Sequence, residues 1–128
     1  MSYYISRTIE SGFDEAVTRV VEALKREGFG VLTDIDVAST MKQKLGVAFR
    51  PYRILGACNP ALAHKALSAE DKVGVMLPCN VIVQEAGAGK IEVAAIDPRA
   101  AMERVGNPAL ADLAREVADK LTRVVSTI

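Results

Sequence analysis

The segment from Val73 to Ile96 constrains the fold most, because it carries the pattern of two strands joined by a short turn. Its first half, VGVMLPCNVIVQ, places apolar residues on alternate positions, which is the period of a half-buried strand. EAGAGK then supplies a glycine-containing turn, and IEVAAI returns as the partner strand. Pro78 cannot donate a hydrogen bond to a strand ladder, so we expect an edge, a bulge or a break there. A short connection of this kind joins antiparallel strands. The alternating positions are Val73, Val75, Leu77, Cys79, Val81 and Val83.

The N-terminal part of the chain predicts a strand and a helix. YYISRTI has the β-rich composition of a short strand. Ser11, with Asp14 three residues later, resembles a capping box, and apolar residues then recur at helical spacing until Gly28. We therefore expect a helix that begins at Ser11 and ends before Gly28. Its apolar residues are Phe13, Val17, Val20, Val21 and Leu24.

A second strand and a short helix are expected next. FGVLTDIDV places apolar residues on odd positions, which is the pattern of a half-buried strand. Ser39 is a favourable N-cap and Gly46 a typical helix stop, so a short helix is expected between them. We expect Met41 and Leu45 of this helix to face inward. The odd positions of the strand are Phe29, Val31, Ile35 and Val37.

Three Asx-Pro dipeptides mark helix starts. YRILGAC has the alternation of a strand, and Asn59-Pro60 ends it. Asparagine and aspartate are favoured N-caps, and proline is favoured at the first helical position because its missing N–H costs nothing there. Asp97-Pro98 and Asn107-Pro108 repeat the device, and this recurrence favours a structural role over a catalytic one at Asn59-Pro60. A long amphipathic helix is predicted from Asn107 onward, lying across the sheet.

The order of these elements predicts the fold class. Strands and helices alternate only in the early part of the chain, and a hairpin follows, so an α+β fold with a largely antiparallel sheet is favoured over a doubly wound parallel one. The length of 128 residues and the absence of a linker, repeat or low-complexity segment predict a single domain over residues 1–128.

The net charge and the N-terminal sequence limit the expected binding partners and the expected cellular location. Sixteen basic residues balance sixteen acidic ones, and no run of like charge occurs, so neither nucleic acid nor an anionic membrane surface is expected as a partner. MSYYISRTIESGF has neither the basic start nor the apolar stretch of a signal peptide, which predicts a cytoplasmic protein. In a reducing cytosol the two cysteines are expected to stay free thiols.

The candidate site rests on two similar dipeptides, Cys58-Asn59 and Cys79-Asn80, each next to a proline. If their strands are neighbours, both thiols and Asn80 could face one pocket, and a helix start beside Cys58 would favour its thiolate. The alternative is that both cysteines are small buried apolar residues of the core. Met76 and His64 are candidates for the rim, although His64 lies off the apolar stripe of its helix. No metal is assigned, because the spacing contains no CxxC or HxxxH pattern.

The chain also resembles a known family. GFGVLTDIDV, KLGVAFRPYRILGACNP, AHKAL, VGVMLPCNVIVQE and AAIDP, in this order and spacing, are similar to the DUF302 family of small bacterial and archaeal proteins. The resemblance implies a TBP-like fold, in which a curved antiparallel sheet of about five strands carries two long and two to three short helices. It also implies homodimers, and it implies no activity. The matching motif positions are Cys58, Asn59, Pro60, His64, Pro78, Cys79, Asn80 and Asp97.

Two functional hypotheses follow. The first is a noncatalytic homodimeric binding or interaction module that holds a small ligand or a partner in a groove of its sheet. No paired-carboxylate, nucleophile–base or phosphate-loop signature is present, so no catalytic residue is assigned. The second is thiol or metal redox chemistry at Cys58 and Cys79, in which the thiols would bind Cu(I), zinc or haem iron. The sequence does not identify a cofactor under either hypothesis.

Overall fold

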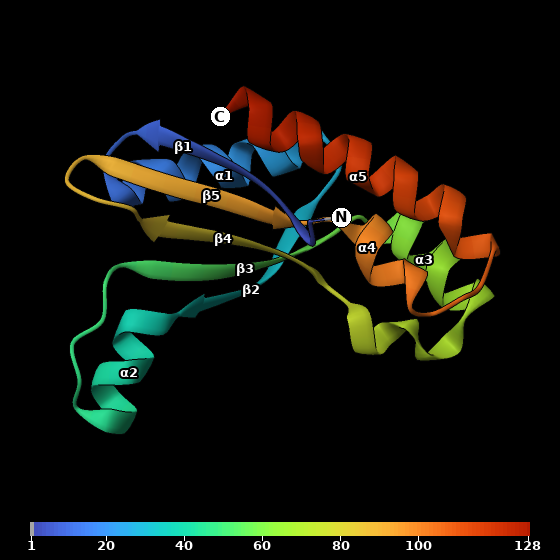
Figure 1. The fold of residues 1–128 in the computed structure, drawn as a ribbon, viewed down its shortest axis with the longest axis horizontal. Coiled ribbons are helices and arrows are strands. Elements are labelled where there is room, and N and C mark those ends of the chain that lie inside the picture. Colours follow the sequence, from blue (N-terminus) through green and yellow to red (C-terminus); the bar gives the residue numbers. More distant parts are fainter. Residues whose placement is uncertain (1) are drawn as a thin grey trace.

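The computed structural model describes residues 2–128 and contains one sheet of five antiparallel strands in the order β1-β5-β4-β3-β2 (Figure 1). The predicted α+β class with an antiparallel sheet of about five strands is therefore confirmed. Every pairing in the sheet joins strands that are consecutive in the sequence, except the pairing of β1 with β5. The strands are β1 (Tyr4–Glu10), β2 (Gly30–Asp36), β3 (Tyr52–Cys58), β4 (Cys79–Glu85) and β5 (Lys90–Ile96).

Two long helices, α1 and α5, cover one face of the sheet, and the shorter helices lie at its ends (Figure 1). α1 contacts β4 and β5, and α5 contacts β1 and β5. The N-terminal part of α5 runs past the sheet and packs against α3 and α4. The helices are α1 (Phe13–Arg26), α2 (Val37–Leu45), α3 (Pro60–Ala69), α4 (Pro98–Glu103) and α5 (Ala109–Thr127), with a 3₁₀ helix η1 (Asp71–Met76). No helix within residues 2–128 is long and apolar enough to cross a membrane.

The hydrophobic core lies between the two long helices and the sheet face that they cover. Side chains from alternate strand positions meet the apolar stripes of α1 and α5, as the 2.0 and 3.6 residue periods require. Arg7 of β1 donates to the carbonyl oxygens of Ser126 and Ile128 at 2.9 and 3.0 Å, which ties the end of α5 to the edge strand. The fully covered residues of this core include Val20, Leu24, Leu55, Val81, Val83, Val93, Leu121 and Val124.

Two predictions about the first helix and the hairpin need correction. α1 begins at Phe13, and Ser11 makes no capping bond, because its hydroxyl donates to the carbonyl of Gly12 instead. The alternation from Val73 onward does not form one strand. Residues 71–76 form η1, in which Val73 is buried while Val75 is 85% exposed, and β4 begins only at Cys79. Pro78 marks the predicted break between them, because it has no N–H for the ladder.

A β-bulge reverses part of the second strand. Val31 pairs with Ala57 and Thr33 pairs with Gly56, so Leu32 is an extra residue between them. An extra residue shifts every following side chain to the other face. Ile35 therefore does not join the core as predicted, and it is 48% exposed on the uncovered face.

Helix α2 also differs from its prediction. Its N-cap is Asp36, whose carboxylate accepts from the N–H of Ser39 at 3.0 Å, and Gly46 ends it in the left-handed region as expected. None of its residues is buried, and Leu45 is 68% exposed rather than inward. The helix stands away from the sheet, and its main contacts within residues 2–128 are with its two flanking strands, β2 and β3 (Figure 1).

Candidate functional site

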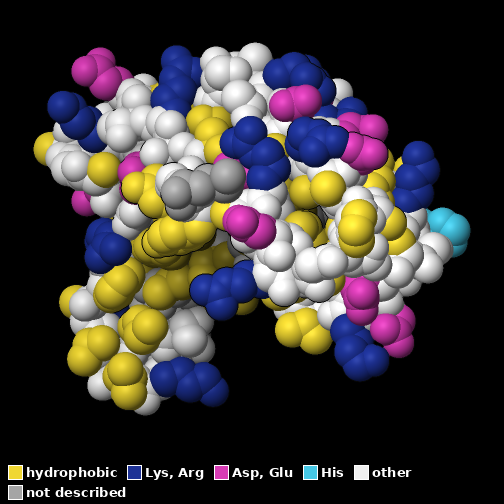
Figure 2. All heavy atoms as spheres, turned by 45° about the vertical axis from the view of Figure 1, so that its right-hand side comes forward, with side chains coloured by type: hydrophobic (Ala, Val, Ile, Leu, Met, Phe, Trp, Pro, Cys, Tyr) yellow, Lys and Arg dark blue, Asp and Glu magenta, His cyan; other side chains and the backbone are white. Residues whose placement is uncertain are grey.

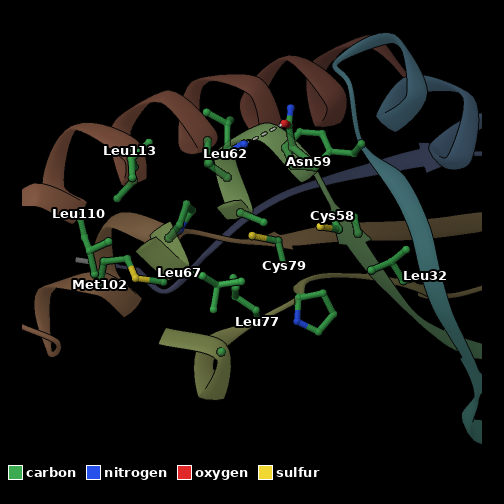
Figure 3. A pocket seen from close by; sticks show the side chains of 18 residues that line it. Leu32, Cys58, Asn59, Leu62, Leu67, Leu77, Cys79, Met102, Leu110 and Leu113 are labelled. Carbon is green, nitrogen blue, oxygen red and sulfur yellow. Dashed lines mark hydrogen bonds between the residues drawn. The ribbon is translucent and has the colours of Figure 1, made fainter. Parts of the chain in front are cut away.

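A pocket of about 350 Å³ lies where β3 ends and β4 begins, between α3, η1, α4 and α5 (Figure 3). α5 and α4 line one side, α3 and the turn after η1 line the other, and the strand ends with the bulged residue Leu32 complete it. None of the residues that line it carries a charge. They are Phe29, Leu32, Ala57, Cys58, Asn59, Leu62, Ala63, Leu67, Gly74, Leu77, Pro78, Cys79, Pro98, Met102, Leu110, Leu113, Ala114 and Val117.

The Asn59-Pro60 pair turns the chain out of the sheet and starts the pocket wall. Asn59 caps α3, and its side-chain oxygen accepts from the N–H of Leu62 at 3.3 Å, while Pro60 occupies the first turn. The predicted role of this dipeptide as a helix start is thus confirmed. Because the amide oxygen of Asn59 is engaged in this bond, it is positioned by the helix rather than directed at a ligand (Figure 3).

The two cysteines lie together at the pocket. Ala57 and Cys79 are directly paired across β3 and β4, so Cys58 adjoins Cys79, and both half-buried thiols are free (Figure 3). Burial, and to a smaller extent the neighbouring Cys58, raises the pKa of the Cys79 thiol to about 11. At neutral pH that thiol is protonated, which makes it a weak nucleophile and a poor metal ligand.

The other candidate residues lie outside this pocket. His64 is on the exposed side of α3 and Met76 ends η1, and neither side chain lines the pocket. Asn80 points to the opposite face of the sheet, because strand side chains alternate and Cys79 faces the pocket. Within residues 2–128 no group of three or more His, Cys, Asp or Glu side chains is placed to hold a metal ion.

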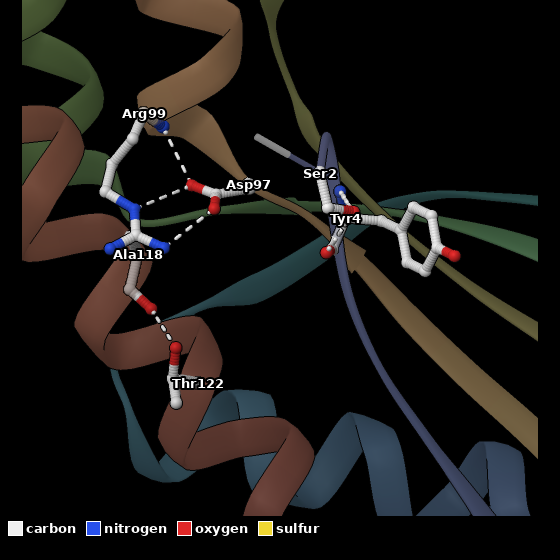
Figure 4. Close-up of polar contacts among 6 residues, drawn as sticks. All are labelled: Ser2, Tyr4, Asp97, Arg99, Ala118 and Thr122. Atoms are coloured by element: carbon white, nitrogen blue, oxygen red, sulfur yellow. Dashed lines mark hydrogen bonds and ion pairs between the residues drawn. The ribbon is translucent and has the colours of Figure 1, made fainter.

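An ion pair fixes the helix at the far side of the pocket. Asp97, only 3% exposed, caps α4 by accepting from the N–H of Arg99 at 3.0 Å. The Arg99 side chain returns to the same carboxylate through Nε at 3.0 Å and a terminal nitrogen at 2.8 Å (Figure 4). These hydrogen bonds hold the pKa of Asp97 below its usual value of 3.8. The pair keeps Pro98 and Met102 against the pocket.

Sequence reasoning did not find most of the pocket. Leu62 and Leu67 belong to the apolar side of α3, and Leu110 and Leu113 to that of α5, but the sequence pattern does not predict their common cavity. The signal that was available is that the segment between β3 and β4 carries its own apolar stripe although those strands are neighbours. A stripe on such a segment must pack on something other than the sheet.

The sheet face opposite α1 and α5, which we call the open face, has no helix of residues 2–128 packed over its centre (Figure 1). A row of apolar side chains crosses it, because Ile35 pairs with Ile54, Ile54 with Ile82 and Ile82 with Ala94. Beside this row a polar chain runs from Arg50 to Gln84 at 2.9 Å and from Gln84 to Glu92 at 2.8 Å. Arg50 and Glu92 are thus both hydrogen-bonded to Gln84 within the chain.

The connection from residue 37 to residue 51, which we call the arm, borders the open face. Phe49 is 38% exposed, and Arg50 lies over the rings of Phe49 and Tyr52, 4.6 and 5.4 Å from their centroids. Hydrophobic side chains gather over α2 and the adjoining part of the sheet in Figure 2. The exposed large apolar residues of the arm and open face are Tyr3, Tyr4, Ile35, Leu45, Val47 and Phe49.

Comparison with known proteins decides the family. The domain of unknown function DUF302 matches residues 5–128. The chain belongs to the DUF302 family. It is also similar to the crystal structure of an uncharacterized conserved DUF302 protein from Bacillus stearothermophilus, with a TM-score of 0.91, 29% identity and 98% of each chain covered. No curated protein matches the chain.

The DUF302 motif positions cluster at one end of the molecule. Cys58, Asn59, Pro78 and Cys79 line the pocket, and Asp97 anchors α4 beside it. His64 and Asn80, which belong to the same motifs, point away. Five of these motif positions therefore lie at or beside the pocket, whereas much of the resembling stretches 28–37 and 44–52 belongs to β2 and the arm.

Proposed function

We propose that the protein is a noncatalytic interaction module that forms a homodimer through its arm and open face. The observation that carries this proposal is that α2 has an apolar side and no buried residue. A helix of nine residues is marginal in water on its own, because helices of this length gain their stability from tertiary packing. In the arm, the contacts with β2 and β3 leave no residue of α2 buried, and a partner would supply further packing.

The arrangement of the arm and the open face favours a second copy as the partner. Both surfaces border the edge strand β2 and its neighbour β3, so a two-fold axis beside them would place each arm on the open face of the other copy. A two-fold interface requires such self-complementary surfaces. Arg50 and Glu92 carry opposite charges and are both hydrogen-bonded to Gln84 within one protomer, so this polar chain adds no net charge to the open face.

Sedimentation equilibrium tests the dimer directly. The wild-type protein is expected to have twice the mass of one chain. Leu45→Glu places a charge on the arm and Ile82→Arg places one on the apolar row, and each is expected to weaken dimerisation about 100-fold or more, as loss of an interface anchor does. Val75→Glu is the matched control, because Val75 is 85% exposed but belongs to η1 rather than to the arm or the strands of the open face.

Two results would contradict the dimer. A wild-type protein that stays monomeric at all attainable concentrations would leave the apolar arm without its proposed partner. Equal weakening by Val75→Glu and Leu45→Glu would show that added charge, rather than the location of the arm, controls association. Circular dichroism of each variant separates loss of association from loss of folding.

Thiol or metal redox chemistry is the second candidate function. It is favoured by the shared pocket of Cys58 and Cys79, and it is disfavoured by the raised pKa of Cys79. Labelling of the native protein with N-ethylmaleimide between pH 5 and pH 9, followed by intact mass, tests it. Rapid labelling of either thiol below pH 7 would favour redox or metal chemistry, and labelling only on unfolding would exclude it.

A further inference from the structure

The pocket where β3 ends and β4 begins has the size and lining of a ligand site, and it lies apart from the arm of the proposed dimer. β3 begins at Tyr52 beside the arm and ends at Cys58 in the pocket, so the two regions lie at opposite ends of one strand. Its volume of about 350 Å³ exceeds the ~150 Å³ of an engineered apolar cavity that stays dry and admits benzene. It also lies within the usual range of ligand pockets.

The lining determines the chemistry of the occupant. No charged side chain lines the pocket, and the amide oxygen of Asn59 already accepts the N–H of Leu62. An ion placed there would lose its hydration without gaining a partner of opposite charge, which is strongly unfavourable. Hydrocarbon, in contrast, would contact leucine, methionine and proline side chains throughout.

The rim of the pocket is apolar as well. Leu32 is 68% exposed and Leu67 is 43% exposed, although both side chains line the cavity. Leu32 reaches this position only because the β-bulge makes it the unpaired residue of β2. Two exposed leucines from separate elements thus flank the cavity, which is the form expected of an entrance for an apolar molecule.

We propose that this pocket binds the hydrocarbon part of a small uncharged molecule. Leu32 and Leu67 guide it in, and the side chains of α3, α4 and α5 enclose it. A polar but neutral group, such as a hydroxyl, stays at the rim in contact with water. A carboxylate on the same hydrocarbon chain is disfavoured, because nothing that lines the pocket neutralises it.

The test uses the full chain and the neutral dye N-phenyl-1-naphthylamine, whose fluorescence rises in apolar surroundings. Titration is expected to saturate at one dye per chain, and decan-1-ol is expected to displace the dye at least tenfold more effectively than decanoate at pH 8. Leu67→Lys is expected to weaken dye binding at least fivefold. Val75→Lys, which adds the same charge to an exposed apolar position that does not line the pocket, should leave binding within twofold.

Several outcomes would overturn the proposal. They are no saturable dye binding by the wild-type protein, displacement by decanoate as effective as by decan-1-ol, and equal effects of Leu67→Lys and Val75→Lys. Dye binding that is lost in Ile82→Arg but retained in Leu67→Lys would assign the dye to the open face instead. Because Ile82→Arg is also the dimer variant, a monomeric protein that still binds the dye would separate the two proposals.

Discussion

The arm and the pocket wall are both connections between neighbouring antiparallel strands, but only the pocket wall buries apolar side chains against the rest of the fold. Residues 37–51 join β2 to β3, and residues 59–78 join β3 to β4, although two residues suffice to link such strands. The arm buries none of the residues of its helix. The pocket wall buries Leu62 and Val73 and packs on α5.

The difference arises from what each connection meets. The wall emerges beside the N-terminal half of α5, which extends beyond the sheet and offers its own apolar stripe. The arm emerges at the other end of the same strands, where no helix of the described chain extends. Additional chain between neighbouring strands therefore encloses an internal cavity where a second apolar element is close by, and leaves exposed apolar side chains where none is.

Excision of each connection gives the largest expected effect and tests this comparison directly. Replacing residues 60–77 with an Asn-Gly turn should lower the free energy of unfolding by roughly 3–6 kcal/mol, because two fully buried side chains are lost. Replacing residues 38–49 in the same way should leave the stability of the monomer nearly unchanged. Urea unfolding at low protein concentration measures both.

A control and a contradiction accompany the excisions. The arm-deleted chain should sediment as a monomer, whereas the wild-type protein should show a concentration-dependent midpoint of unfolding if it dimerises. A large loss of monomer stability on removal of residues 38–49 would mean that the arm supports its own sheet, and the contrast with the wall would fail.

Two glycines sharpen the comparison at the level of single residues. A Cβ on Gly56 would overlap the hydroxyl of Thr33 and lie 2.8 Å from Cγ of Pro78, the last residue of the wall connection. Gly56→Ala should therefore cost about 3 kcal/mol of stability through overpacking. Gly46 in the arm has a φ of 66° and open space around it, so Gly46→Ala should cost only about 1 kcal/mol, from backbone strain alone.

Thermal and urea unfolding of the two alanine variants check this difference. Similar losses for both would show that Pro78 and Thr33 yield easily, and that the end of the wall is less tightly packed than its contacts indicate. Thr33→Ala combined with Gly56→Ala serves as the control, because removal of the hydroxyl relieves one of the two overlaps and should restore part of the loss.

Sequence reasoning predicted the features that neighbouring residues determine. Asn59 and Asp97 cap helices as expected, Gly46 ends α2, and the hairpin of β4 and β5 has the predicted turn. These signals act over three or four residues, where the capping atom and the capped N–H belong to one short stretch of chain. Local chemistry therefore suffices to predict them.

The errors arise where distant residues decide the outcome. The bulge at Leu32 turned Ile35 to the open face, and an alternating pattern cannot reveal an extra residue in the pairing. Val75 was assigned to a strand by its alternation, yet it lies exposed on η1. The pocket combines side chains from α3, α4 and α5. Its sequence signals are the apolar stripe between β3 and β4 and the two cysteines, which the sequence leaves open between a shared pocket and the core.

Loss of the two caps has a moderate expected effect. Asn59→Ala removes the bond to the N–H of Leu62, and because Leu62 is buried against the rest of the fold, about 1 kcal/mol of global stability should be lost. Asp36→Ala removes the equivalent bond to Ser39, but α2 packs on nothing beyond its flanking strands. Amide exchange in α2 should accelerate while global stability stays constant. Equal global losses would show that the arm unfolds together with the core.

The smallest effect is expected from two ion pairs, one at each end of the sheet, as the pH is lowered. Hydrogen bonds from Arg99 lower the pKa of Asp97, and those from Arg53 lower the pKa of Asp34. A carboxyl whose pKa is lower in the folded state stabilises the fold above its unfolded pKa, near 3.9, and this stabilisation is lost as the pH falls through the folded value.

The two carboxylates differ in exposure, and this difference predicts which pair has the larger influence. The Asp97 side chain is 5% exposed, whereas that of Asp34 is 39% exposed and screened by water. Asp97→Asn should therefore flatten the fall in stability between pH 5 and pH 2 more than Asp34→Asn does, while Asp71→Asn, whose carboxylate is 82% exposed, should change nothing. Urea midpoints over this pH range measure the slopes. If Asp34→Asn flattened the pH dependence of stability more than Asp97→Asn, the ion pair at the base of the arm would stabilise the fold more than the one beside the pocket. The pocket end would then be stabilised by apolar packing alone.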